Sequence, residues 1–264
     1  MLWRVRGSNL AILGSLHTSS RRLAFRPGVE NALERAEVIA FEANLDVAPD
    51  MTSGRYSKTG RLSEVISLDL YRDAAVLWES LGLPLDDLEH FRPWAAAFTL
   101  MNNVSSRHGF DTRYGVDRQA LNFGKARRKT LFFLEDVNAG FLPFKQAPLH
   151  EQENLLANAV RNTEENVRDL QTMVDAWEVS QPSQLVPIAE KGRLRTPTIF
   201  TAAISGRNRK WLPKLLKLAG SGKQVVAAVG ALHVVAAVDS LPSLLGQHGY
   251  TCELDETVGA AGDA

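Results

Sequence analysis

The stretch ILGSLHTSS, residues 12–20, ends an apolar run with a glycine and, three residues later, a histidine. Nearly the same phrase occurs in VVAAVGALHVV, residues 225–235, so that Gly14-Ser15-Leu16-His17 is matched by Gly230-Ala231-Leu232-His233. Short apolar runs of this kind are typical of strands that are buried on both faces of a sheet. We therefore expect His17 and His233 to lie just beyond the ends of two core strands.

Further strands are predicted on either side of these two. Residues 2–6 and 10–13 flank a GSN turn, which predicts an antiparallel hairpin at the start of the chain. The runs VIAFEA (38–43) and TLFFL (130–134) read as buried strands, and residues 250–254 as an edge strand. Apolar residues recur at helical spacing after Pro27, before Gly220, and over 62–81 and 150–177.

These segments predict an α/β fold. It has a mixed central sheet with an N-terminal antiparallel hairpin, βα crossovers and large helical insertions at about 60–125 and 150–205. We expect a single domain over residues 1–258 and a disordered tail over 259–264, where the sequence is GAAGDA.

Composition excludes several classes of function. The 264 residues contain 30 basic and 30 acidic side chains without a long run of one sign, so the charge gives no support for nucleic-acid binding. The single cysteine, Cys252, rules out an internal disulfide and a thiolate zinc site, so any metal must be held by nitrogen and oxygen. No apolar run is long enough to span a membrane, and no leader is visible. The expected location is therefore cytoplasmic, or periplasmic or secreted if a leader has been removed.

Polar side chains follow four of the predicted strands. His17, Glu42, Glu135 with Asp136, and His233 each come at or just after a strand end. In open α/β sheets, ligands bind beyond the carboxyl ends of the strands. Two neutral imidazoles and one or more carboxylates suit zinc, manganese, cobalt or iron, with positions left for water and substrate. A metal in such a site lowers the pKa of its bound water to about 7, and a free carboxylate can carry the proton.

Simpler interpretations exist for the same residues. A histidine after a strand often only caps a turn, and Glu42 can be a carboxylate held in a salt bridge. The glycine three residues before each histidine is expected to let the backbone turn sharply off the strand and to let a ligand approach closely. The other histidines, His90, His108, His150 and His248, are expected on the surface.

The order of motifs resembles the TraB/GumN family, which includes the Tiki proteases. The opening segment 2–46 resembles the family's hairpin ending in GxxH, followed by a helix and a strand with a glutamate. Segment 114–136 matches through Gly115, Asp117, Ala126 and Leu134-Glu135, and GRNRKW (206–211) resembles the family's Arg-Asn-x-x-Trp helix. Segment 227–255 resembles the closing strand, second GxxH, helix and final strand.

The resemblance implies a metal-dependent hydrolase, most simply a peptidase acting on a peptide or small-molecule substrate. It implies His17, His233 and Glu42 as ligands of a divalent metal (manganese, cobalt or zinc). The catalytic residues that it nominates are Glu42, Arg207, Asn208, Glu135 and Asp117. Arg207 or Asn208 would stabilise the oxyanion, although an arginine at a helix start also often pairs with a carboxylate such as Asp117. The family commonly has a glycine where this chain has Ala236, a change expected to crowd the site or to alter the start of the helix.

Two other functions remain open at this point. One is a metal-free hydrolase, resembling the erythromycin esterases of a related fold, in which a histidine is the base. The other is a binding protein without turnover, for haem or iron as in the related ChaN-like proteins, or for a peptide. For that function the helical insertions would form an apolar cover, with Phe91, Trp94, Phe98 and Met101 either lining it or making ordinary core contacts. The oligomeric state is not predicted.

Overall fold

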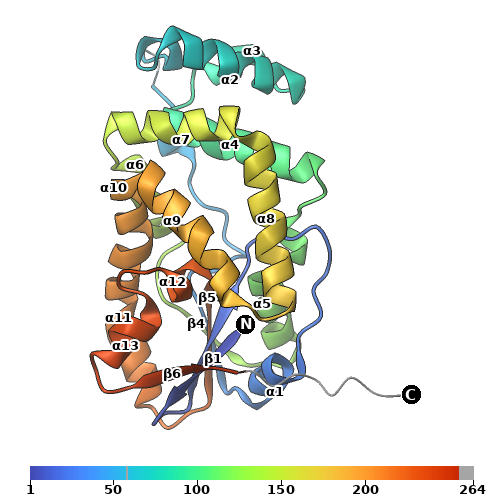
Figure 1. The fold of residues 1–264 in the computed structure, drawn as a ribbon, viewed down its shortest axis with the longest axis vertical. Coiled ribbons are helices and arrows are strands. Elements are labelled where there is room, and N and C mark those ends of the chain that lie inside the picture. Colours follow the sequence, from blue (N-terminus) through green and yellow to red (C-terminus); the bar gives the residue numbers. More distant parts are fainter. Residues whose placement is uncertain (58, 256–264) are drawn as a thin grey trace.

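A six-stranded mixed sheet forms the base of the molecule (Figure 1). The structure is a computed structural model, and it describes residues 1–57 and 59–255. The strand order is β4-β3-β5-β2-β1-β6. The strands are β1 (Leu2–Arg6), β2 (Leu10–Ser15), β3 (Val38–Phe41), β4 (Thr130–Phe133), β5 (Val225–Gly230) and β6 (Thr251–Leu254). The predicted α/β class is confirmed, and the predicted tail at 259–264 lies outside the described residues.

The four strands β4, β3, β5 and β2 run parallel, and β1 is antiparallel to both β2 and β6. Every residue of β2, β3 and β5 is buried, as the apolar runs predict. Ser15 pairs with Gly230 at the end of the β2–β5 ladder. The two GxxH phrases therefore leave the sheet side by side, at the carboxyl edge of neighbouring strands.

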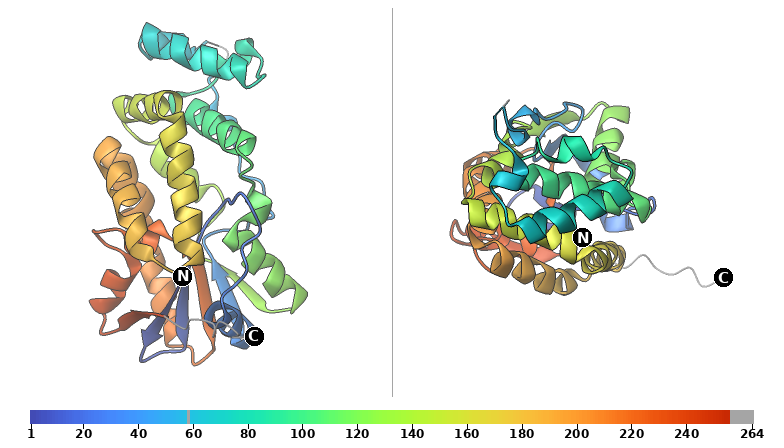
Figure 2. Two further views of the ribbon diagram at one scale, coloured as in Figure 1. Left: turned by 45° about the vertical axis from the view of Figure 1, so that its right-hand side comes forward. Right: turned by 90° about the horizontal axis from the view of Figure 1, so that it is seen from above.

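Helices cover both faces of the sheet (Figures 1 and 2). On one face lie α1 (Pro27–Arg35) and α5 (Val116–Ala126), and α5 contacts β3, β4 and β5. On the other face α11 (Arg207–Ala219) contacts β5 and packs on α13 (Leu241–Gly246). The helix α11 continues a π-helical segment, Thr201–Gly206, that follows α10 (Pro197–Phe200).

A helical cover stands over the carboxyl edge of the sheet (Figure 1). Its outer part comprises α2 (Leu68–Ser80), α3 (Leu85–Leu88), α4 (Pro93–Arg107) and α7 (Leu149–Arg161), which share a second apolar core. From there α8 (Thr163–Glu178) and α9 (Val186–Arg195) run towards the sheet. Short α6 (Leu142–Lys145) and α12 (Leu232–Val235) complete the set of α-helices, with 3-10 turns at Thr52–Gly54, Leu62–Glu64, Thr112–Tyr114, Ala139–Phe141 and Pro182–Leu185. The division of the chain into one domain with two insertions stays a prediction; α5, inside the first of these spans, packs on the sheet itself.

The long helical pattern predicted over 150–177 is two helices. It breaks at Asn162, whose φ of −119° and ψ of 32° are not helical. Asparagine side chains hold this corner: Asn162 Nδ2 donates to Asn158 Oδ1 (3.0 Å), and Asn166 Nδ2 donates to the Asn158 carbonyl (3.1 Å). Apolar periodicity continues across this corner, so it could not reveal the break.

Residues of the cover are anchored directly to the sheet. The indole Nε1 of the fully buried Trp177, at the end of α8, donates to the Gly14 carbonyl (2.8 Å). Within the described part of the chain, no helix is both long enough and apolar enough to cross a membrane.

Candidate active site at the carboxyl edge of the sheet

Glu42 is the first residue after β3, and its carboxylate lies at the carboxyl edge beside Gly230, at the end of the neighbouring strand β5. Oε1 accepts a hydrogen bond from the Gly230 backbone N–H (2.6 Å) and lies 3.7 Å from His233 Nε2. A Cβ placed on Gly230 would lie 3.2 Å from Glu42 Oε1, 3.4 Å from His17 Nε2 and 3.5 Å from His233 Cδ2. The two histidines and the glutamate therefore surround one point, which we call the Gly230 cradle.

His17 is oriented by Asp117. The ring Nδ1–H donates to Asp117 Oδ2 (2.6 Å), while the other carboxylate oxygen accepts from the Arg118 N–H (2.7 Å). The backbone of Gly115, two residues before Asp117, passes close to His17. A Cβ on Gly115 would lie only 2.6 Å from the His17 carbonyl oxygen, so glycine at this position allows Asp117 to reach the ring. Its Nδ1 being engaged, His17 presents Nε2 to the cradle, and 61% of its side chain is exposed.

His233 lies in α12 and is oriented by an amide. Its Nδ1–H donates to Asn208 Oδ1 (2.7 Å), and the ring stacks against Trp211 with centroids 4.5 Å apart. Asn208 Nδ2 in turn donates to the carbonyls of His233 (3.0 Å) and Asp239 (2.8 Å). All polar atoms of this buried amide are thus engaged, so Asn208 positions His233 and has no group left for a substrate.

Arg207 bridges two carboxylates beside the cradle. Its Nη2 donates to Glu42 Oε2 and, at 2.7 Å, to Glu135 Oε1, which also accepts from Nε (2.9 Å). Nη1 lies 3.4 Å from His233 Nε2. The other carboxylate oxygen of Glu135, Oε2, accepts a hydrogen bond from Trp211 Nε1 (2.9 Å). The π-helical segment just before Arg207 sets the start of α11, a kind of local distortion that is frequent at functional sites.

The surroundings of the two histidines shift their pKa values in opposite directions. Desolvation by the surrounding protein would lower the pKa of His17, but the adjacent Asp117 carboxylate, with Glu42, outweighs it and raises that pKa to about 9. Burial lowers the pKa of His233 to about 3, and Arg207 adds to this effect. Burial would raise the pKa of Glu42, but Arg207, together with the two histidines and the Gly230 N–H, outweighs it and lowers that pKa to about 2. Near neutral pH the site therefore holds an imidazolium, a neutral imidazole and a carboxylate.

The glycines of the two phrases act differently from the sequence expectation. Gly14 and Gly230 lie inside strands and neither has a positive φ, so a sharp backbone turn is not their role. Their missing side chains matter instead. A Cβ on Gly14 would lie 2.8 Å from the Trp3 ring, and Gly230 leaves the cradle open. The close packing of Glu42 and the two histidines around Gly230 is a physical reason for glycine at this position, and the approach of a ligand stays a prediction.

The three side chains predicted as metal ligands, His17, His233 and Glu42, lie together. One of them, Glu42, is bound to the guanidinium of Arg207. Both histidines have Nδ1 occupied and Nε2 directed to the cradle side, which is the usual state of a metal-binding imidazole. Among the described residues, no group of three or more His, Cys, Asp or Glu side chains is arranged to hold a metal ion.

The sequence also led to expectations for Asp117, Ala236 and the remaining histidines. Asp117 pairs with His17 and not with Arg207, whose partners are Glu42 and Glu135. Ala236 has φ −55° and ψ 140°, an ordinary conformation for alanine at the end of α12. The four remaining histidines are exposed, as expected.

Sequence reasoning missed the role of Trp211. Its indole binds Glu135 and its ring covers both His233 and, at 4.6 Å, the Arg207 guanidinium. The signal was present in the spacing of Arg207, Asn208 and Trp211, because positions i and i+4 lie on one face of a helix. Of the aromatic residues proposed for the cover, Trp94 and Phe98 pack against Phe141 instead, so they make core contacts.

The chain was compared with curated proteins, solved structures and models of protein families. Neither the curated proteins nor the solved structures gave a significant match. The family model described as the TraB/PrgY/gumN family matches residues 1–254, which include every residue of the site described above. The chain belongs to the TraB/PrgY/gumN family.

Proposed function

We propose that this chain is a hydrolase that cleaves a peptide or ester bond at the Gly230 cradle. One observation carries the proposal: His17 Nε2, Glu42 Oε1 and the His233 ring all lie within 3.5 Å of one point, with the Arg207 guanidinium beside them. This set supplies a proton carrier, a fixed negative charge, a neutral imidazole and a cation. The addition of water to a carbonyl needs a group that accepts the proton and a positive group that stabilises the oxyanion, and this set contains both.

His17 is the proton carrier of the set. When neutral, its Nε2 accepts a proton from the attacking water; as imidazolium it returns that proton to the departing amine or alkoxide. Asp117 holds the ring and stabilises the imidazolium, as the carboxylate does in other aspartate–histidine pairs. Glu42 suits this role less well, because a carboxylate with a pKa of about 2 is a weak base.

Arg207 is the group that stabilises negative charge on the carbonyl oxygen. Its Nη1 faces His233 at the cradle, and the side chain is fixed by two carboxylates before any substrate binds. Such prior orientation is what makes an electrostatic contribution to catalysis effective.

A divalent metal, manganese, cobalt or zinc, fits the cradle by the chemistry of its donors. His17 and His233 would hold it through Nε2, with Glu42 as the carboxylate ligand. When bound, the metal would polarise the carbonyl and lower the pKa of water. Asp117 and Asn208 would then be the groups that orient the two ligand rings.

Hydrolysis without a metal is the second candidate, and Arg207 is the observation that favours it. A guanidinium already contacts Glu42 and lies 3.4 Å from His233 Nε2, so a positive charge stands beside the cradle. In that mechanism Arg207 alone stabilises the negative charge on the carbonyl oxygen, and His17 transfers the proton.

The test is turnover of a peptide anilide and of a small aryl ester. Protein stripped with chelator is compared with protein supplied with manganese, cobalt or zinc. We expect hydrolysis that falls by about 10²- to 10⁴-fold in His17→Ala. The matched control, His248→Ala, changes an exposed histidine far from the cradle and is expected to retain the rate.

The metal supply separates the two candidates. Turnover only in the supplied samples supports the metal-dependent enzyme, and chelator-insensitive turnover that still requires His17 supports the metal-free one. Equal activity of His17→Ala, or binding of haem or peptide with no turnover under any condition, contradicts the proposal.

A further inference from the structure

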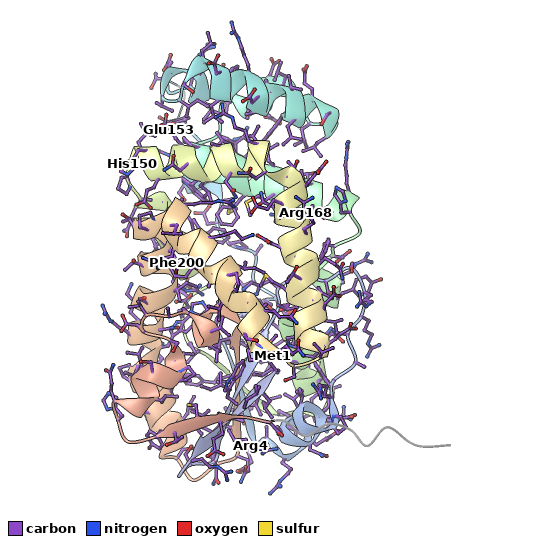
Figure 3. The ribbon with its side chains drawn as sticks, viewed as in Figure 1. Met1, Arg4, His150, Glu153, Arg168 and Phe200 are labelled. Atoms are coloured by element: carbon purple, nitrogen blue, oxygen red, sulfur yellow. The ribbon has the colours of Figure 1, made fainter. Side chains whose placement is uncertain are left out.

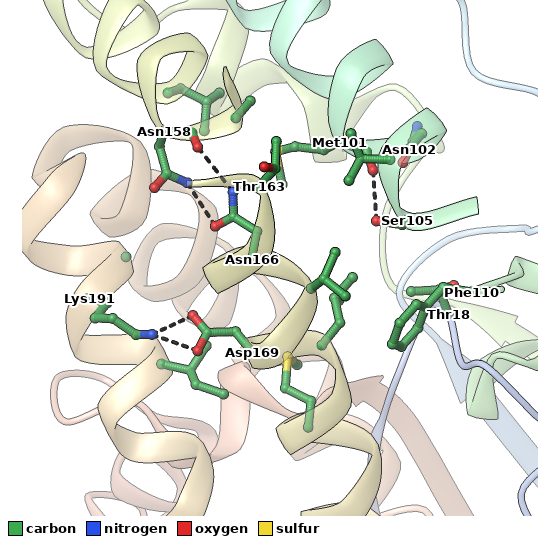
Figure 4. A pocket seen from close by; sticks show the side chains of 18 of the residues that line it. Thr18, Met101, Asn102, Ser105, Phe110, Asn158, Thr163, Asn166, Asp169 and Lys191 are labelled. Carbon is green, nitrogen blue, oxygen red and sulfur yellow. Dashed lines mark hydrogen bonds and ion pairs between the residues drawn. The ribbon is translucent and has the colours of Figure 1, made fainter. Parts of the chain in front are cut away.

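The helical cover contains a cavity of about 650 Å³ (Figure 4). It lies between α4, α7, α8 and α9, and none of the cradle residues lines it. The proposed hydrolysis therefore assigns it no role. Its size is within the range of about 300–1,000 Å³ that is usual for small-molecule sites.

One end of the cavity reaches the cradle residues through their neighbours in the chain. Thr18 follows His17 and Leu232 precedes His233, and both line the cavity. Figure 4 shows Thr18 beside Phe110 on the side of the strands, while Asn158 and Asn166 lie on the opposite wall. A group in the cavity thus lies next to both GxxH segments.

The middle of the cavity is apolar. Its wall includes Met101 and Val104 from α4, Leu170 and Met173 from α8, and Ile188 from α9. Replacing water against such a wall by an apolar group is favourable, because it removes apolar surface from water.

Each of the four charged groups of the wall, Asp111, Asp169, Lys191 and Arg195, is paired with a group of opposite charge, and Asp111 Oδ2 accepts from Arg113 Nε (2.8 Å). Lys191 Nζ donates to Asp169 Oδ1 (2.6 Å) and to Glu165 Oε1 (3.1 Å), and Arg195 donates to Glu165 Oε2 (2.7 Å). A charged occupant would find no unpaired partner among the four charged groups of the wall and would lose its hydration. The wall therefore selects an uncharged occupant.

We propose that this cavity binds uncharged aliphatic or aromatic side chains of a peptide substrate, next to the bond that is placed at the cradle. The inference rests on the proposed function, because it takes the occupant to be part of the molecule that is cleaved. It adds the substrate class: a peptide with apolar residues beside the cleaved bond.

The test measures binding and needs no turnover. Titration calorimetry uses two blocked tetrapeptides, one of Leu and Phe and one of Ser and Asn. Leu170→Trp fills the cavity from α8, and Met101→Trp fills it from α4. The matched control is Arg168→Trp, on the exposed side of α8, where 70% of the side chain is accessible (Figure 3).

We expect the apolar tetrapeptide to bind the unmodified chain, His17→Ala and Arg168→Trp equally, and to bind both cavity-filling variants at least ten-fold more weakly. Thermal unfolding confirms that a variant is folded before its affinity is compared. Equal binding by both cavity-filling variants, equal binding of the polar tetrapeptide, or binding of decanoate without the apolar tetrapeptide overturns the proposal. Because His17→Ala is expected to keep its affinity, loss of turnover and loss of cavity binding are told apart.

Discussion

The two GxxH segments have nearly the same sequence and opposite environments. His17 is exposed over 61% of its side chain and donates to a carboxylate, whereas His233 is buried and donates to an amide. The pKa of His17 is raised to about 9 and that of His233 is lowered to about 3. The difference teaches that a repeated motif here places two rings at one point, and that the charge of each ring is set by its surroundings: a carboxylate partner for His17 and burial for His233.

The partners come from different parts of the chain. Asp117 lies in the first turn of α5, on one face of the sheet, and Asn208 lies in the first turn of α11, on the other. The sheet supplies the shared point and the flanking helices supply the difference. Four variants test this comparison.

Arg207→Met is expected to have the largest effect. It leaves Glu42 and Glu135 as buried carboxylates without their common partner, and breaking a buried ion pair costs about 3–5 kcal/mol. Denaturant unfolding measures the loss. A fall in stability below about 1 kcal/mol would mean that Arg207 does not hold the carboxylates together.

Asn208→Leu removes what makes the His233 side distinctive while keeping a side chain of similar size. Loss of a group that orients an active-site imidazole typically costs about 10- to 100-fold in activity or metal affinity. Turnover of the small ester measures it. The matched variant Asn31→Leu, at an exposed position of α1, is expected to leave that turnover unchanged. If Asn208→Leu has full activity, the amide does not position His233.

Asp117→Asn makes His17 more like His233. Without the carboxylate, the pKa of His17 falls from about 9 towards its ordinary value of 6.5, so more of the ring is neutral at a given pH. The limb on which turnover rises with pH is expected to move to lower pH, even where the maximal rate is reduced. An unmoved limb in the pH profile would contradict the assignment of His17 as proton carrier.

The same shift predicts a change of stability with pH. Since the folded pKa of His17 is raised, its stabilising contribution is complete below pH 6.5 and is lost as the pH rises through about 9. The difference in unfolding free energy between the unmodified chain and Asp117→Asn should therefore shrink over that window. A difference that grows with pH would contradict the sign.

Ala236→Gly is expected to have the smallest effect. The alanine is in an ordinary backbone conformation, so glycine mainly adds freedom to the unfolded chain, at about 0.4–1 kcal/mol. Turnover should be unchanged. An increase of ten-fold or more would show that the alanine crowds the site after all.

The sheet and the composition of the site could be predicted because they depend on local patterns. The apolar runs located the strands to within a residue or two, and the carboxyl-edge rule brought Glu42 and both histidines together. The break at Asn162 could not be predicted, because apolar spacing continues through it. The pairing of Arg207 with Glu42 and Glu135 was also out of reach, since it depends on where α11 starts in space.

The central claim is that two matched histidines at one point carry different charges. A titration of the imidazole nitrogens by NMR tests it most directly, with His17→Ala and His233→Ala assigning the signals. The account predicts that His17 titrates well above pH 6.5. It also predicts that His233 stays neutral near neutral pH, with its proton on Nδ1. If both rings titrate together near pH 6.5, the two segments are equivalent and the account is contradicted.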